Sequence, residues 1–148
     1  MPNGLSNRRH LPALLVSLAL LVATACRPAA KLPDKSSKEY ADAVKAFYVG
    51  LAALQVGDDV RADERLAALT KLVPAEPAGW ANWGLLALRQ RNFDDAAARL
   101  EHARTLAPDD DQISYLVGLL ESSRGKSAEA VAALRKAVEQ NPKNLVAT

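Results

Sequence analysis

Few side chains in this sequence are of the kinds that perform chemistry, and their spacing assembles no reactive site. The 148 residues contain one cysteine, Cys26, and two histidines, His10 and His102. A zinc site needs several such ligands, and a cysteine nucleophile needs a base beside its thiol. No second histidine and no cysteine is near His102 in the sequence, so we expect a solvated helix residue there. The sequence predicts no enzyme and no cofactor.

The acidic side chains come in short runs, at 58–59, 94–95 and 109–111. The third run suggests calcium, but it lacks the spaced oxygens and the closing glutamate of an EF-hand loop. Adjacent residues of a helix point about 100° apart, so neither pair provides a facing acid and base. Each run lies at the start of a predicted helix, where negative charge stabilises by ~0.3–1 kcal/mol. We interpret the runs as helix starts and predict no metal site.

The elements that carry these side chains follow from an internal repeat. Four residue types recur at intervals of 34 positions. They are Gly50, Gly84 and Gly118; Ala62, Ala96 and Ala130; Leu66, Leu100 and Leu134; and Pro74, Pro108 and Pro142. A period of 34 is typical of stacked pairs of helices. Such arrays usually bind other proteins.

The recurring residues predict how each pair is built. The glycine lacks a Cβ, which lets the second helix approach the first, and the alanine is the matching small residue on the second helix. A glycine inside a helix costs ~1 kcal/mol relative to alanine, so close packing must compensate. The proline disfavours helical backbone in the residue before it and ends the second helix. In the turn between the helices, Asp58, Asn92 and Ser127 are predicted N-caps.

These residues resemble the tetratricopeptide repeat family, with copies over 43–76, 77–110 and 111–144. The middle copy matches best, at Trp80, Gly84, Ala96, Leu100, Ala103 and Pro108. The first copy has Ala46 and the third has Ser114 where the family favours tryptophan, and Glu121 replaces the usual tyrosine. The resemblance implies an all-α, right-handed solenoid of about three helix-turn-helix repeats over 37–148. It also implies that Trp80 packs in the core, although Trp80 and Trp83 share a helix face and could stack on a ligand.

In this family the first helices line a concave surface where partners usually bind. The resemblance implies a largely apolar groove of Phe47, Leu51, Leu54, Ala81, Leu85, Leu88, Arg89, Tyr115 and Leu119. The family's carboxylate clamp is absent, because Phe47, Leu51, Gln112 and Leu116 stand at its positions and only Asn82 matches. We therefore expect an amphipathic helix or an apolar peptide in the groove. A downstream segment of a longer chain is an equal alternative.

The first 25 residues have the form of a secretory signal. Arg8 and Arg9 precede an apolar run over 11–25, which is shorter than the ~20 residues that cross a bilayer. Small residues lead directly to Cys26 and resemble the lipobox of bacterial lipoproteins, in which that cysteine is lipidated and becomes the mature N-terminus. Ala23 departs from the usual leucine. An ordinary signal cut elsewhere and an uncleaved anchor are the alternatives.

The lipoprotein resemblance implies an anchor in the bacterial cell envelope. Two or more acyl chains hold a membrane stably, whereas a single chain binds reversibly. Arg27 stands where aspartate would retain such a lipoprotein, so the outer membrane, facing the periplasm, is expected. Residues 26–36 are predicted to be a flexible tether. Ser36 and Glu39 form a capping box that predicts a first helix over 37–56.

Net charge does not indicate a nucleic-acid partner. The formal charge of +2 comes from 19 basic and 17 acidic residues. Arg8 and Arg9 lie in the signal, so the remainder carries 17 of each. No basic stripe interleaved with aromatic residues is present, so we expect no nucleic acid to bind.

The last predicted helix leaves apolar side chains that no later residue is predicted to cover. A predicted last helix over 128–140 presents Val131, Leu134 and Val138, and terminal repeats usually carry a polar outer face. A truncated or larger parent, dimerisation through this end, and termination with modest stability are the alternatives. The leading hypothesis for function is a lipid-tethered, non-catalytic scaffold that binds a protein. Alternatives are an N-terminal accessory module of a larger secreted protein or enzyme, and a homo-oligomeric structural element.

Overall fold

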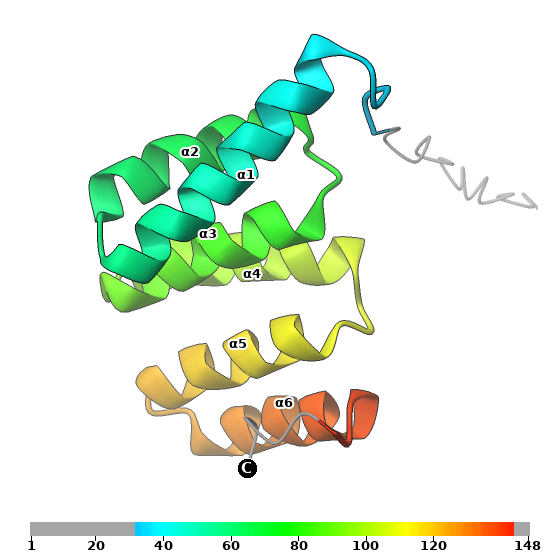
Figure 1. Ribbon diagram of the computed structural model, residues 1–148. Helices are drawn as coiled ribbons and strands as arrows, with labels where there is room; N and C mark the ends of the chain where they lie inside the picture. The colour runs from blue at the N-terminus through cyan, green and yellow to red at the C-terminus, as the bar shows by residue number, and fades with distance from the viewer. Residues whose placement is uncertain (1–31, 144–148) are drawn as a thin grey trace, which may run out of the picture.

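Six α-helices form three consecutive helix pairs in the computed structural model, which describes residues 32–143 (Figure 1). The helices are α1 (Lys38–Val56), α2 (Asp59–Leu72), α3 (Pro77–Arg89), α4 (Phe93–Leu106), α5 (Asp111–Ser123) and α6 (Ser127–Gln140). The pairs stack in chain order, and no strand occurs within the described range. The prediction of an all-α solenoid of helix pairs is confirmed. The predicted signal, Cys26 and residues 144–148 lie outside the described residues.

The glycine of each repeat lies where the two helices of a pair come closest. A Cβ added to Gly84 would lie 2.7 Å from Cγ of Leu100 on α4. A Cβ on Gly118 would lie 2.7 Å from Cγ of Leu134 on α6. In the first pair the corresponding distance, from Gly50 to Leu66, is 3.2 Å. The second and third pairs therefore have no room for a side chain at this point.

The second helices end just before the prolines. After α2, α4 and α6 a single residue leads to Pro74, Pro108 and Pro142, respectively. That intervening residue has ψ between 73° and 86° at all three places. A residue before proline is driven out of the helical region by the proline ring, which explains the common end point.

Two of the three predicted N-caps between paired helices are confirmed. Asp58 accepts a hydrogen bond from the backbone N–H of Arg61, and Asn92 accepts one from Asp95. The prediction for Ser127 is wrong, because Ser127 is the first residue of α6. Lys126 holds the cap position and makes no side-chain cap hydrogen bond.

The capping box predicted at the start of the first helix is also displaced by one residue. Ser37, and not Ser36, caps α1 by accepting a hydrogen bond from the backbone N–H of Tyr40 at 3.1 Å. Ser36 instead donates both its hydroxyl and its backbone N–H to Asp34. The hydroxyl hydrogen bond, and then the backbone one, lowers the pKa of the Asp34 carboxyl. The hydroxyl of Ser36 is thus used within the preceding turn.

The core runs through the stack as a series of small clusters between neighbouring helices. The largest side chains that are completely buried are Leu66, Leu86 and Leu100. Leu66 and Leu86 belong to a cluster that joins the first and second pairs, and Leu100 belongs to one that joins the second and third. Each pair therefore depends on its neighbour to bury apolar surface, as expected for a repeat array.

Candidate functional site

The first helices of the three pairs form a continuous surface. Helix α3 contacts both α1 and α5 in addition to its own partner α4. Leu51, Leu85 and Leu119 occupy the same position in successive pairs, and each of them is half-buried. Because equivalent positions recur along the stack, these three leucines form a row across α1, α3 and α5. Phe47 and Tyr115, at another equivalent position, are also half-buried.

Two of the predicted groove residues lie in the core instead of on this surface. Leu54 is 6% exposed and packs with Ala53 and Leu86. Ala81 is 7% exposed and packs with Ile113 and Ala103. Their side chains support the groove from below and offer little area to a partner. Leu88 is half-buried against the cluster around Leu100.

Arg89, predicted at the edge of the groove, is engaged within the protein. Its Nη1 donates to the backbone carbonyl of Leu54 at 2.6 Å, and its Nη2 lies 3.1 Å from Oδ1 of Asp59. The side chain therefore ties α3 to the turn between α1 and α2. A partner at this edge would meet an arginine whose charge is already paired.

A cavity at the first end of the stack extends the predicted surface. It has a volume of about 310 Å³, and Phe47 is the one predicted groove residue that lines it. The other aromatic and apolar members from α1 are Tyr40, Ala43, Val44 and Tyr48, and Leu32 and Pro33 of the preceding segment also line it. Sequence reasoning missed these residues. For the residues of α1 the available signal was their spacing from Phe47: Val44 precedes it by three residues and Tyr40 by seven, about one and two helical turns on the same face, and Tyr48 follows it directly.

Trp80 and Trp83 pack against the protein, and their indole N–H groups have protein acceptors. Trp80 Nε1 donates to the carbonyl of Pro74 at 2.9 Å, and Trp83 Nε1 donates to Asp63 at 2.7 Å. The interpretation of Trp80 as a packing residue agrees with its contact with the cluster of Ala81, Ala103 and Ile113. His102 is exposed, as predicted, but its ring also lies 4.2 Å from that of Trp80 between centroids.

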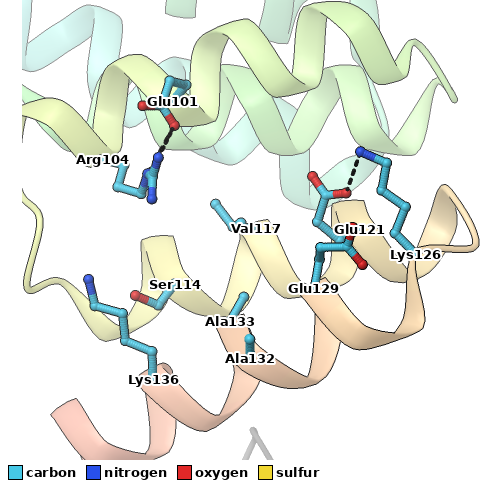
Figure 2. A pocket seen from close by; sticks show the side chains of 10 residues that line it. All are labelled: Glu101, Arg104, Ser114, Val117, Glu121, Lys126, Glu129, Ala132, Ala133 and Lys136. Atoms are coloured by element: carbon cyan, nitrogen blue, oxygen red, sulfur yellow. Dashed lines mark hydrogen bonds and ion pairs between the residues drawn. The ribbon is translucent and has the colours of Figure 1, made fainter.

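A second cavity, of about 460 Å³, lies between α4 and the last helix pair (Figure 2). Its walls carry Glu101 and Arg104 from α4, and Ser114, Val117 and Glu121 from α5. The remaining members come from the start and outer part of α6: Lys126, Glu129, Ala132, Ala133 and Lys136. This cavity was not predicted from the sequence. The signal was present in Ser114 and Glu121, the two departures of the third copy from the family pattern.

Neither membrane spans nor metal clusters are found in the described part of the chain. Among residues 32–143, no helix has both the length and the hydropathy needed to cross a bilayer. Across the same residues, no three or more histidine, cysteine, aspartate or glutamate side chains are placed to hold a metal ion.

A family model and several solved structures are similar to this chain. A family model described as tetratricopeptide repeat matches residues 81–144. No curated protein matches the chain. Among solved structures, MamA from Desulfovibrio magneticus RS-1 is similar at 25% identity with a TM-score of 0.64, covering 74% of this chain and 61% of that one.

Two further structures have lower identity and the same fold. The second domain of human RPAP3, solved with an HSP70 peptide, has 19% identity and a TM-score of 0.67, covering 74% of this chain and 91% of that one. An O-GlcNAc transferase mutant of Thermobaculum terrenum has 20% identity and a TM-score of 0.72, covering 76% of this chain. The match spans only 22% of the transferase. With its 34-residue period, its stacked helix pairs and the family model that matches residues 81–144, the chain has the fold of tetratricopeptide repeat proteins.

Proposed function

We propose that this protein is a non-catalytic interaction scaffold that binds an apolar peptide or an amphipathic helix across its first helices. The observation that carries the proposal is the row of Leu51, Leu85 and Leu119, flanked by Phe47 and Tyr115. Each of these side chains is half-buried, so part of its apolar surface remains open to solvent. An apolar strip across three helices is the surface that a helix with apolar residues at i, i+3 and i+4 would cover.

Peptide complexes of similar structures support a role in peptide binding. Domains of RPAP3 were solved with the HSP90 peptide SRMEEVD and the HSP70 peptide SGPTIEEVD, and a domain of yeast Sti1 with Hsp70. The two RPAP3 peptides are acidic at their ends. Leu51 and Leu116 stand at positions where a carboxylate clamp would need polar or basic side chains, and Arg89 is paired with Asp59. The proposal therefore specifies an apolar ligand and not an acidic peptide terminus.

Paired aspartate substitutions test the groove. Leu85→Asp and Leu119→Asp place charges at the centre and at one end of the row and should abolish capture of partners from envelope extracts. Val60→Asp is the matched control, because Val60 lies in the first turn of α2 and is 74% exposed, so the same change leaves the fold and the groove intact. Circular dichroism shows whether each variant remains helical. Identical partner lists for the folded groove variants and for the control would contradict the proposal.

We further propose that Cys26 is acylated and anchors the protein in the bacterial outer membrane, with the repeats in the periplasm. The sequence around Cys26 supports this, through the basic start, the apolar run and the small residues before the cysteine. Mass spectrometry of the mature protein should find an acylated N-terminal cysteine. Cys26→Ser should move the protein out of the membrane fraction. A mature N-terminus at another residue, with an unmodified Cys26, would contradict the anchor while leaving the groove proposal untouched.

A second candidate function is that of an N-terminal accessory repeat module in a larger secreted protein or enzyme. The similarity to 22% of an O-GlcNAc transferase favours it, since there the corresponding helices are one part of a longer enzyme. Sequencing the transcript past the codon for Thr148 separates the two. A continuing reading frame supports the module, and an immediate stop codon rejects it.

Self-association through α6 is the remaining alternative. Val131 is 55% exposed on this last helix, and Leu134 and Val138 on the same helix are half-buried. Light scattering should show an average mass that rises with concentration, and Val131→Glu should remove the rise. A constant monomer mass over the accessible concentrations would reject the oligomer.

A further inference from the structure

The cavity between α4 and the last helix pair has a counterpart in the middle of the stack. Residues 34 positions earlier occupy the equivalent place between α2 and α4. There the site is filled by four large side chains: Trp80, Trp83, Arg99 and His102. In the last pair the equivalent residues are Ser114, Val117, Ala133 and Lys136, all of which line the cavity.

The middle repeat shows what this site is shaped to hold. The guanidinium of Arg99 lies 3.9 Å from the ring centroid of Trp83, and the rings of Trp80 and Trp83 are 5.8 Å apart. The rings of Trp80 and His102 are 4.2 Å apart. Two indoles, a guanidinium and an imidazole thus form one stacked group between successive second helices.

In the last repeat the equivalent helices are present, but the large side chains between them are not. A serine and a valine replace the two indoles, and an alanine replaces the arginine. The backbone carbonyl that receives the indole N–H of Trp80 is that of Pro74, and its equivalent, the carbonyl of Pro108, is 2.8 Å from Nζ of Lys136. Gln140 also donates to this carbonyl at 3.3 Å and accepts from the hydroxyl of Ser114 at 2.7 Å, so that Ser114 is 4% exposed. These smaller side chains do not fill the volume that the indoles and the guanidinium occupy in the middle repeat, and a cavity of about 460 Å³ remains. This volume is within the usual range for ligand sites.

Charged groups around the opening suit an aromatic ring with a single N–H donor. Arg104 lines the wall from α4, and its Nη2 lies 2.6 Å from Glu101. Lys136 lines the wall from α6. A cation over an indole face is attractive, as Arg99 and Trp83 already illustrate in this chain. On the other side Glu129 offers carboxylate oxygens as acceptors for the indole N–H, and next to it Glu121 is paired with Lys126 at 3.4 Å (Figure 2).

We propose that this cavity binds a tryptophan side chain presented by a partner polypeptide, which supplies the indole that the last repeat lacks. The site is distinct from the groove of the first helices. Ser114, Val117 and Glu121 lie on a different face of α5 from Tyr115 and Leu119, because residues one position apart on a helix point about 100° apart. The proposal therefore adds a second contact, and it does not depend on the apolar groove.

Amide NMR of the folded protein tests the site with a defined probe. N-acetyltryptophanamide should produce saturable shifts of the amide signals of Val117, Ala132 and Ala133, and no saturable shift at Leu51 or Leu85. N-acetylleucinamide is the comparison ligand and should bind at least tenfold more weakly. Equal binding of both ligands would overturn the specificity for an indole. Shifts that do not saturate, or that lie elsewhere, would overturn the site.

A cavity-filling variant gives a second readout. Ser114→Trp restores the indole found at the equivalent position of the middle repeat, so it should raise the thermal midpoint and abolish probe binding. Ser122→Trp, on an exposed position of the same helix outside the cavity, is the matched control and should leave binding unchanged. If Ser114→Trp fails to fold, Ala132→Phe at the exposed mouth of the cavity should still weaken binding at least tenfold. Unaltered binding in both the Ser114 and the Ala132 variants would overturn the proposal.

Discussion

At the residue scale, the three turns inside the helix pairs show one backbone requirement met by two different residue types. Gly57 has φ of 77° and Gly125 has φ of 76°, whereas the equivalent residue of the middle repeat is Arg91, with φ of 60°. This left-handed region costs a residue with a Cβ ~1–2 kcal/mol and costs glycine almost nothing. The middle repeat thus carries a local strain that the other two repeats avoid.

Arg91→Gly should therefore stabilise the protein. The relief of the left-handed backbone exceeds what is lost, because the Arg91 guanidinium is 6.0 Å from the Phe93 ring and contributes only ~0.5 kcal/mol there. A net gain of about 0.5–1 kcal/mol in the free energy of unfolding is expected. Urea denaturation measures it, and Gly125→Ala should shift the midpoint in the opposite direction. A loss of stability in Arg91→Gly would show that the side chain contributes more than its one visible contact.

The repeat glycines predict a graded response to alanine. Gly84→Ala would push a Cβ to 2.7 Å from Cγ of Leu100, which is completely buried and cannot move aside. Overpacking of this kind costs ~1–3 kcal/mol, against a helix-propensity gain of ~1 kcal/mol. Gly50→Ala, at 3.2 Å from Leu66, should be close to neutral because the two effects nearly balance. Chemical denaturation of the two variants tests the order, and equal midpoints would contradict it.

At the scale of the element, the helices could be predicted well because each boundary has a local chemical cause. Prolines at fixed intervals end the second helices, and Asp58 and Asn92 cap α2 and α4, so both ends of these two helices were predicted. The start of α6 was predicted one residue late, because Lys126 holds its cap position without a side-chain hydrogen bond. The start of α1 was misplaced because two neighbouring residues offer equivalent chemistry. Ser36 and Ser37 both provide a hydroxyl, and only the position of Asp34 decides which one caps α1. Sequence alone does not specify that hydrogen bond.

Asp58 caps α2 with a side-chain hydrogen bond and Lys126 does not cap α6, so replacing each by alanine should cost different amounts of unfolding free energy. Asp58→Ala removes the side chain that accepts from the Arg61 N–H and should cost ~1 kcal/mol of unfolding free energy. Lys126→Ala should cost clearly less, because Lys126 makes no cap hydrogen bond and its ion pair with Glu121, 3.4 Å long, is partly exposed. Thermal melts of the two variants compare them directly. A larger loss in the Lys126 variant would mean that the ion pair, and not the cap, sets the stability of this turn.

At the scale of the whole molecule, the 34-residue period predicted the stack of helix pairs. It did not predict which side chains of the groove are exposed or where a cavity lies. Leu54 and Ala81 share positions with groove residues of neighbouring repeats, yet both are buried, because burial depends on the side chains of adjacent helices. The cavity beside α6 was hidden for the same reason. Ser114 breaks the family pattern, but the space it leaves becomes apparent only when the equivalent Trp80 and its neighbours are seen packed together.

Two arginines connect successive helix pairs, and they predict how cooperatively the stack unfolds. Arg89 joins the second pair to the first, and Arg124 joins the third to the second. Arg124 Nη2 donates to the carbonyl of Phe93 at 2.8 Å and to Asp94 at 3.1 Å. Only 22% of the Arg124 side chain is exposed, which strengthens its hydrogen bond to the Phe93 carbonyl, whereas the Asp94 side chain is fully exposed and its ion pair contributes little. Stability in a repeat array is the sum of repeat and interface contributions, so each arginine contributes to one interface.

Arg124→Met keeps the apolar stem and removes the charged hydrogen bonds, at an expected cost of ~1–2 kcal/mol. Because the α4–α5 interface weakens, the last pair should open before the rest, and the amides of α5 and α6 should exchange with solvent faster than those of α3. Hydrogen exchange measured residue by residue compares the exchange rates of these helices. Lys38→Met, in an exposed pair with Asp42 on α1, is the matched control and should change nothing. Uniform acceleration of exchange in all six helices would instead mean that the described stack opens as a single unit and that its interfaces cannot be weakened one at a time.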